Sequence, residues 1–379
     1  MGLLSTPIAA ELVRGAAELE TTGGGLVPHR LPGRARAQCD DPTLDRAESQ
    51  PSGVRLVLRT RATELELDTR RTKLVYRGAP PRRDGVYDLL VDGELAAQSS
   101  TTGGDALLLD MATGAAETEP GPPGTVRFTD LPGRDKELQI WLPHDERTEL
   151  LALRTDAAVA QAPVTRPVWL HHGSSISHGS DAASPTTTWP AVAAARGGVE
   201  LINLGFGGSA LLDPPTARTM RSAPADVISV KIGINLVNRD LMRLRAFGPA
   251  VHGFLDVLRE GHPTTPLLVV SPLHCPIHEQ TPGPSAPDLR DGQLQFGATG
   301  DPADPTKLTL ATIRTELARI VDQRADPTLH HLDGSALYGP ADFGELPLPD
   351  QLHPDASTHV RIGERFAELV FGPAGAFPR

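Results

Sequence analysis

The stretch VWLHHGSSIS, residues 168–177, decides the fold of the second half of the chain. Its apolar first part is typical of a short buried strand, and the Gly-Ser-Ser that follows indicates a turn. Similar apolar runs alternate with helical patterns toward the C-terminus, which predicts parallel β-α-β units and a three-layer α/β/α (flavodoxin-like) domain with its site at the carboxyl ends of the strands. The expected strands are 168–173, 199–205, 225–233, 266–272 and 328–334, and the expected helices are 186–197, 246–261, 307–326 and 357–372.

The first half of the chain has a different periodicity. Between Ser52 and Thr155, apolar and polar residues alternate in short runs that Gly, Pro and Asp separate, which predicts an antiparallel β-sandwich. The expected strands are 54–60, 64–69, 73–78, 87–93, 125–131, 138–143 and 149–155. The segment Pro163–Pro167 is a plausible hinge. We therefore expect a jelly-roll-like accessory domain over residues 1–162 and a catalytic domain over residues 163–379.

Composition narrows the class of partner. The 379 residues carry a formal charge of −11, spread over both halves of the chain, which argues against a nucleic-acid partner. No apolar run is long enough for a membrane span. The two cysteines do not make a disulfide framework, and the first residues lack the basic region of a signal peptide, so we expect a cytoplasmic protein with reduced thiols.

Four turns carry groups that suit acyl transfer. Ser175 follows the first strand of the α/β/α domain, the glycine pair Gly207–Gly208 follows the second, and Asn235 follows the third. Asp350 and His353 share a turn before the last helix, where the carboxylate can reach the imidazole and orient it as a base. Glycine N–H groups and an Asn amide can donate to an oxyanion. Each turn alone also fits a purely structural role, but together they supply a nucleophile, oxyanion donors, a base and an orienting acid.

These turns resemble the ordered sequence blocks of the SGNH (GDSL-type) hydrolase superfamily. The matching residues are Gly173–Ser177, Asn203–Gly208, Gly233–Asn235 and Asp350–His353, and the resemblance covers residues 168–371. It implies Ser175 as the nucleophile, His353 as the base, Asp350 as its partner, and the Ser175 N–H, Gly208 N–H and Asn235 side chain as the oxyanion hole. Two positions depart from the family, which usually has Asp where this chain has Ser174 and often has Asp where it has Leu236.

The layout of a sandwich followed by this domain is similar to two-domain actinomycete members of the superfamily, some of which acylate natural products. The expected reaction is therefore serine-dependent acyl transfer on a carboxylic ester, with water or an acceptor hydroxyl resolving the acyl-enzyme. We expect a small-molecule ester as the partner, together with an alcohol acceptor if the enzyme is a transferase, and no cofactor or metal. The alternatives are an acetyl esterase with a glycan-binding sandwich and an inactive binding protein on the same scaffold.

Other residues permit competing interpretations. The segment 276–305, rich in Pro, Gly and Asp, is either a lid over the site or a surface insertion. The segment 274–278 (HCPIH) suggests a metal site, but its spacing matches no common pattern, and pocket or loop packing is the simpler interpretation. Arg239 and Arg243 follow Asn235 and are either ligands of a substrate carboxylate or phosphate or solvated surface. We expect His171 and His172 to be side chains that point to alternate faces of a strand, and Trp189 to pack at the start of a helix.

Overall fold

The computed structural model describes residues 2–78, 80–110, 113–290 and 293–377. The chain divides by its contacts into two compact units. Unit 1 contains residues 1–32, 48–165 and 184–186, and unit 2 contains residues 33–47, 166–183 and 187–379. The main boundary between the units lies between residues 165 and 166, three residues after the boundary expected between 162 and 163. The segment 33–47, which was expected in the first domain, packs in unit 2.

Unit 1 consists of two β-sheets. The first contains β10 (Ala116–Glu119), β9 (Asp105–Leu109), β6 (Leu65–Tyr76), β13 (Arg147–Thr155), β4 (Leu26–His29) and β3 (Glu18–Thr21) in this order, with β1 (Leu4–Thr6) on β13 and β11 (Gly124–Phe128) on β6. The second contains β14 (Val159–Gln161), β5 (Arg55–Thr60), β12 (Lys136–Trp141), β7 (Tyr87–Val91) and β8 (Glu94–Ser99), with β2 (Val13–Arg14) on β5. The described pairs are antiparallel except for β6 with β9.

One apolar core joins the two sheets of unit 1. Leu65 and Leu67 from the first sheet and Leu56, Leu58 and Ile140 from the second are fully buried in it. Within β6 and β5 these residues lie two positions apart, at 65 and 67 and at 56 and 58, as the period of two requires when one face of each sheet packs in the shared core. The sandwich expected for this half of the chain is therefore confirmed.

Strand β6 shows where the sequence pattern misleads. The runs 64–69 and 73–78 predict two strands, but β6 is continuous over twelve residues. The polar residues between the runs stay in the strand because Arg70 pairs with Glu149 at 3.4 Å and Arg71 pairs with the buried Glu146 at 3.3 Å. Ion pairing across the sheet thus compensates for the missing apolar side chains.

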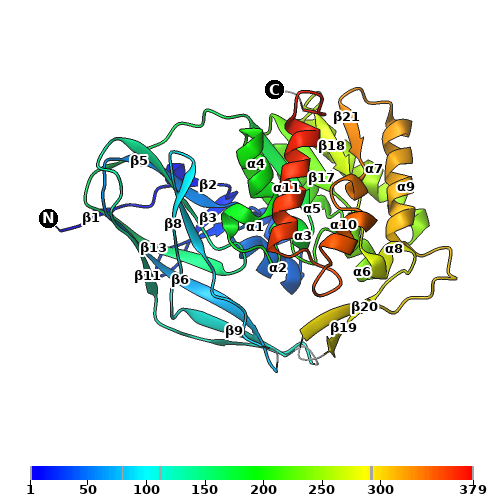
Figure 1. The fold of residues 1–379 in the computed structure, drawn as a ribbon, viewed down its shortest axis with the longest axis horizontal. Helices are drawn as coiled ribbons and strands as arrows, with labels where there is room; N and C mark the ends of the chain where they lie inside the picture. Colours follow the sequence, from blue (N-terminus) through cyan, green and yellow to red (C-terminus); the bar gives the residue numbers. More distant parts are fainter. Residues whose placement is uncertain (1, 79, 111–112, 291–292, 378–379) are drawn as a thin grey trace. The chain divides into compact units, whose positions relative to one another are not determined.

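Unit 2 is built on a parallel sheet of five strands. The strands are β16 (Glu200–Gly205), β15 (Val168–Gly173), β17 (Val227–Lys231), β18 (Leu267–Val270) and β21 (Leu329–Leu332), in this order. The helices are α3 (Ser175–His178), α4 (Trp189–Gly197), α5 (Pro214–Ser222), α6 (Ile234–Asn238), α7 (Leu244–Gly261), α8 (Pro276–Glu279), α9 (Leu310–Arg324), α10 (Pro340–Glu345) and α11 (Ala356–Phe371). The predicted α/β/α fold is confirmed (Figure 1).

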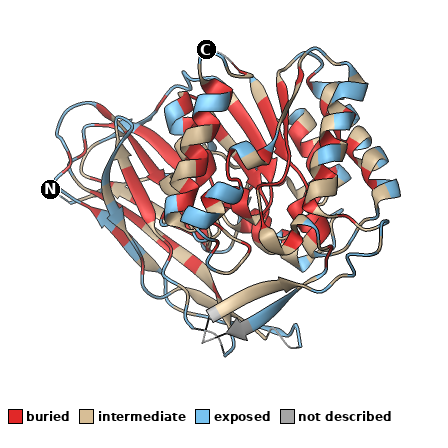
Figure 2. Cartoon of the chain, turned by 45° about the vertical axis from the view of Figure 1, so that its right-hand side comes forward, coloured by how far each residue is buried: buried red, intermediate tan, exposed pale blue. Residues whose placement is uncertain are grey.

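Helices cover both faces of this sheet, and its strands are the most buried part of the unit (Figure 2). Helices α4 and α11 pack on one face, where Trp169 of β15 stacks on Phe366 of α11 at 5.0 Å between ring centroids. On the other face His172 of β15 stacks on Phe254 of α7 at 5.8 Å. Among the described residues, no helix combines the length and apolar composition needed to cross a bilayer.

Two further segments complete unit 2. Helix α1 (Gly33–Arg36) lies in the segment 33–47, as does the start of α2 (Pro42–Ser49). This segment reaches α5, where Arg218 hydrogen-bonds the side chain of Gln38. The segment 276–305 forms α8 and a hairpin of β19 (Ser285–Arg290) and β20 (Gln293–Ala298), where the sequence pattern indicates only an irregular loop.

Candidate active site

Ser175 is the first residue of α3, directly after the turn that ends β15. The turn is tight: a Cβ placed on Gly173 would lie 2.3 Å from the Ser177 Oγ atom, so only glycine fits there. The Ser175 hydroxyl is half-buried at the carboxyl end of the sheet. Its Oγ atom lies 2.9 Å from Nε2 of His353, a residue 178 positions later in the chain.

Asp350 holds the imidazole of His353 through the other ring nitrogen. Its Oδ2 atom lies 2.6 Å from the His353 Nδ1 atom. Its Oδ1 atom accepts backbone N–H groups of Leu352 at 2.9 Å and of His353 at 2.6 Å, which closes the turn around the carboxylate. The turn thus fixes the orientation of both side chains, as the spacing of three residues predicts.

The charge state of Asp350 suits this arrangement. Burial by itself would raise the pKa of the carboxyl, but the hydrogen bonds that it accepts from the His353 side chain and from the backbone of His353 and Leu352 outweigh it and hold the pKa below its usual value. An ionised carboxylate only accepts hydrogen bonds, so His353 carries its proton on Nδ1 and leaves Nε2 free to accept the Ser175 proton.

The other two blocks are joined at residues 207–210, beside Ser175. Gly208 has φ of +71°, a conformation that favours glycine, and a Cβ placed on Gly207 would lie 3.9 Å from the Ser175 Cβ atom. Asn235 is buried at the start of α6, where its Oδ1 atom accepts the Ala210 N–H at 3.1 Å. This bond fixes the amide and leaves its Nδ2 atom as a donor. The structure therefore brings all five predicted residues to one edge of the sheet.

A second layer of polar residues, which the sequence analysis did not assign to the site, supports α3. Asn203 of β16 donates from Nδ2 to the Ser177 carbonyl at 2.9 Å and accepts the Gly205 N–H on Oδ1 at 2.9 Å. His171 of β15 hydrogen-bonds the Ser177 hydroxyl through Nε2 at 2.8 Å. Burial, with the nearby His172 and Lys231, lowers the pKa of His171 well below its ordinary value, so this imidazole is neutral. For both Asn203 and His171, the sequence signal that could have indicated a role in the site was a polar residue within an otherwise apolar strand.

The hairpin β19–β20 contributes an aromatic side chain to the site. The Phe296 ring meets the His353 ring edge-on, with centroids 6.0 Å apart and planes at 78°. The Phe296 N–H donates to the Asp350 carbonyl at 2.9 Å. The segment 276–305 thus contacts the turn that carries Asp350 and His353.

The competing residues take structural positions. Burial, with the charges of Glu279 and Asp350, raises the pKa of Cys275 to about 12, so its thiol is protonated at neutral pH. His274 pairs with Glu279 at 3.1 Å, and His278 hydrogen-bonds the Thr281 carbonyl at 3.1 Å. The Cys275 thiol donates to the Gln351 carbonyl at 3.4 Å, so the three side chains of the HCPIH segment have three different partners. Trp189 is fully buried and packs its ring 4.8 Å from that of His171.

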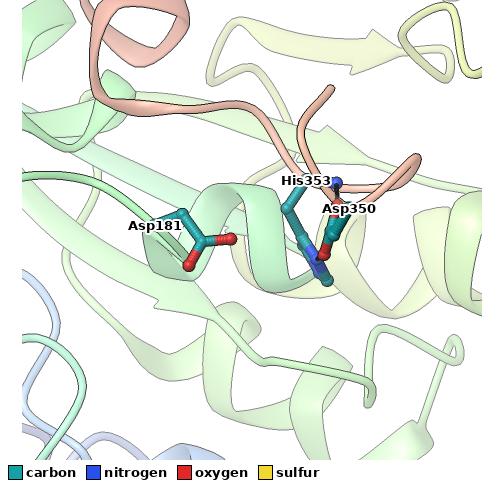
Figure 3. Close-up of side chains that lie close together, drawn as sticks. All are labelled: Asp181, Asp350 and His353. Atoms are coloured by element: carbon teal, nitrogen blue, oxygen red, sulfur yellow. Dashed lines mark hydrogen bonds and ion pairs between the residues drawn. The ribbon is translucent and has the colours of Figure 1, made fainter. Parts of the chain in front are cut away.

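Asp181, on the loop after α3, is a third acidic neighbour of this group. Its exposed carboxylate points toward His353 and Asp350, and one ligand atom from each residue lies within 4.8 Å of the others (Figure 3). In the part of the chain that the structure describes, this is the one cluster with the donors and spacing of a metal site. His353 already bonds Asp350 through one ring nitrogen and Ser175 through the other, however, so a cation there would compete with these two hydrogen bonds.

Comparisons with known proteins agree with this geometry. Residues 165–278 match the model of the GDSL-like Lipase/Acylhydrolase family, and no curated protein sequence matches the chain. The chain is similar to the structure of the salicylyl-acyltransferase SsfX3 from a tetracycline biosynthetic pathway, with 29% identity and a TM-score of 0.79 over 96% of this chain and 95% of that chain.

Two more distant structures share the fold over the full length. A Bacteroides ovatus protein assigned as a GDSL-like lipase is 18% identical, with a TM-score of 0.67 over 96% of both chains. An acetyl xylan esterase, Est2A, from Butyrivibrio proteoclasticus is 11% identical, with a TM-score of 0.55 over 99% of this chain and 100% of that chain. Each of these likenesses includes the sandwich as well as the α/β/α unit.

Proposed function

Because the chain belongs to the SGNH (GDSL-type) superfamily of ester-acting enzymes, we propose that it transfers an acyl group from a small-molecule ester to an acceptor hydroxyl through an acyl-enzyme on Ser175. The observation that carries the chemistry is the hydrogen-bonded series from Ser175 Oγ through His353 to Asp350, at 2.9 and 2.6 Å. The similarity to an acyltransferase over nearly the whole chain favours a hydroxyl acceptor over water.

The first half of the reaction forms the acyl-enzyme. The Ser175 Oγ atom attacks the ester carbonyl carbon while its proton passes to Nε2 of His353. The resulting oxyanion accepts hydrogen bonds from the N–H groups of Ser175 and Gly208 and from the Asn235 amide. His353 then gives its proton to the departing alkoxide, and the tetrahedral intermediate collapses to a Ser175 ester.

The second half regenerates the enzyme. The acceptor hydroxyl gives its proton to His353 as its oxygen attacks the acyl carbon, and His353 returns that proton to Ser175 when the new ester leaves. Water in place of the acceptor gives hydrolysis by the same steps. The Phe296 ring beside His353 provides an apolar neighbour on the base, which fits a site that limits water near the acyl-enzyme.

Labelling with a fluorophosphonate tests the proposed nucleophile and base. We expect one adduct, which peptide mass spectrometry locates on Ser175, and at least a hundredfold slower labelling in His353→Ala. His252→Gln is a matched control because His252 lies on α7, where it contacts Arg324 of α9, and its removal should leave the rate unchanged. An adduct on another residue, or equal rates in His353→Ala and the wild type, would contradict the proposal.

Product analysis tests the acceptor. An acyl ester is offered with and without a panel of alcohols, including sugars and polyphenols, and free acid is compared with new ester. We expect the new ester to form only with the Ser175 hydroxyl intact and to dominate with at least one acceptor. Free acid as the main product with every acceptor would favour an esterase, and cleavage confined to sugar acetates would favour the carbohydrate-esterase alternative.

The free thiols of Cys39 and Cys275 fit the reducing compartment that the predicted cytoplasmic location implies. This location stays a prediction. Fractionation of the native host, with the protein detected by antibody in the cytosolic or the secreted fraction, tests it.

A further inference from the structure

Arg239 lies next to the proposed oxyanion hole. It follows the last residue of α6, four positions after Asn235, and residues four apart lie on the same face of a helix. Its backbone N–H bonds the Asn235 carbonyl at 3.3 Å, which continues the helical turn. The short helix that positions the oxyanion donor Asn235 thus also positions a guanidinium group.

The guanidinium lies against Gly208. A Cβ placed on Gly208 would be 3.5 Å from Arg239 Nη2 and 3.9 Å from its Nε. On the other side of the same glycine pair, a Cβ placed on Gly207 would be 3.9 Å from the Ser175 Cβ atom. Only this dipeptide therefore separates the cation from the nucleophile. A side chain at position 208 would crowd Arg239, whereas glycine leaves that space open.

The segment 33–47 supplies a second polar group. The Thr43 hydroxyl accepts from Arg239 Nη2 at 3.2 Å, and the Thr43 Cγ2 atom would lie 3.3 Å from the Cβ placed on Gly208. Thr43 is far from the α/β/α motifs in sequence, yet it belongs to the same compact unit as Ser175. It holds one end of the guanidinium and leaves other N–H donors of the fork for a ligand.

The charges around Arg239 show that it differs from its neighbours. Asp240 is already paired with Arg243 at 2.6 Å and with Lys307 at 2.9 Å. Arg239 is exposed, and among the residues that the structure describes no carboxylate pairs with it. In the described part of the chain, Arg239 thus differs from Arg243 and Lys307, whose charges Asp240 neutralises.

We propose that Arg239 and Thr43 bind a carboxylate on the acyl group of the substrate, so that the enzyme prefers esters of dicarboxylic or otherwise anionic acids. This inference rests on the proposed function of Ser175. The leaving alkoxide must face His353, which protonates it, so a cation on the Gly208 side lies nearer the acyl part of the ester. The planar fork of arginine matches a carboxylate with two parallel hydrogen bonds.

A matched pair of esters tests the inference. Mono-4-nitrophenyl adipate carries a free carboxylate, and methyl 4-nitrophenyl adipate carries the same acyl chain without the charge. We expect the wild type to have at least tenfold higher kcat/KM for the anionic ester. Arg239→Gln should lower the anionic-to-neutral ratio by about tenfold, mainly through KM, and Arg239→Lys should restore part of it, because hydrogen bonds from a cationic donor to a carboxylate are stronger than neutral ones. Thr43→Val should lower the ratio about threefold.

Arg243→Gln is the matched control, since Arg243 is four residues further on and already paired with Asp240. It should leave the ratio unchanged. An equal anionic-to-neutral ratio in the wild type and in Arg239→Gln would overturn the carboxylate site. In that case, Ser175-dependent hydrolysis of the neutral ester would still support the proposed function. If Arg239→Gln instead affects 4-acetoxybenzoate relative to its methyl ester, the anion lies on the alcohol and the acyl assignment is wrong. Failure of Ser175 to react with either adipate ester or with fluorophosphonate would refute both proposals.

Discussion

Asp350→Asn isolates the orienting role that we propose for this carboxylate, because the variant keeps the size and shape of the side chain. The Oδ1 atom of Asp350 accepts two backbone N–H groups, from Leu352 and His353. An Asn in that position keeps both bonds only if its own oxygen stays there, which places its NH2 group at the present Oδ2 position, against His353 Nδ1. The imidazole must then accept on Nδ1 and carry its proton on Nε2, where it can no longer take the Ser175 proton.

The expected loss of activity in Asp350→Asn follows from the hydrogen bonds that the side chain makes. Turning the amide over would restore the proton on Nδ1 but would set an NH2 group against two backbone N–H groups, at a cost of about 1–3 kcal/mol for each donor left unpaired. The unproductive orientation therefore dominates. By analogy with other Ser-His-Asp enzymes, we expect kcat/KM to fall about 10³- to 10⁴-fold, which equals roughly 4–5.5 kcal/mol of transition-state stabilisation.

The assay compares kcat/KM for a 4-nitrophenyl ester with the melting temperature of the same samples. Because the turn keeps its two backbone bonds, the melting temperature of Asp350→Asn should stay within a few degrees of the wild type. Asp181→Asn is a matched control, since Asp181 is near the same pair but exposed, and we expect less than a tenfold effect. A variant Asp350→Asn that is well folded and retains more than a tenth of wild-type activity would refute this role for Asp350.

Three further predictions concern the donors and the buried groups. Asn235→Ala should lower kcat about 10²- to 10³-fold with little change in KM, because a donor to the oxyanion acts mainly in the transition state; an unchanged kcat in steady-state assays would exclude this role. Burial and the charge of Asp41 raise the pKa of Asp213 to about 6, so the stability that this group contributes is present below pH 4 and is lost as the pH rises to 6. Asp213→Asn should therefore raise the melting temperature more at pH 7.5 than at pH 4.5, and the opposite order would contradict the assignment. The thiol of Cys275, with a pKa of about 12, should resist iodoacetamide at pH 8 in the native protein and react on unfolding; rapid native alkylation, located by peptide mapping, would count against its burial.

Much of the α/β/α unit follows from local patterns. Short apolar runs before glycine turns predict strands, and parallel strands bring the turns after them to one edge, so Ser175, Gly208 and Asn235 could be placed together from sequence alone. The turn Asp350–His353 could be interpreted because its two partners are three residues apart. The strand periodicity of the sequence sets the sheet edge at which the first three residues lie, and the short spacing in the chain sets the interaction between Asp350 and His353.

Patterns failed where partners are far apart in sequence. Strand β6 continues through Arg70 and Arg71 because of acidic side chains about 75 residues later, which no window of local sequence contains. The sequence of the hairpin β19–β20 has no clear alternation of apolar and polar residues. Its Phe296 is placed beside His353 by a backbone hydrogen bond to Asp350. Short elements with few apolar residues depend on tertiary contacts for their place.

The sequence by itself determined the two kinds of fold, the four blocks and the order of the groups that we propose for acyl transfer. It did so because strand periodicity, glycine turns and short spacings are local properties. Only the tertiary structure decided that the segment 33–47 packs in the same unit as Ser175, which sets Thr43 and Arg239 against Gly208. Whether a charged side chain such as Arg239 is paired or available depends on residues brought together from distant parts of the chain, and this information exists only once the chain is folded.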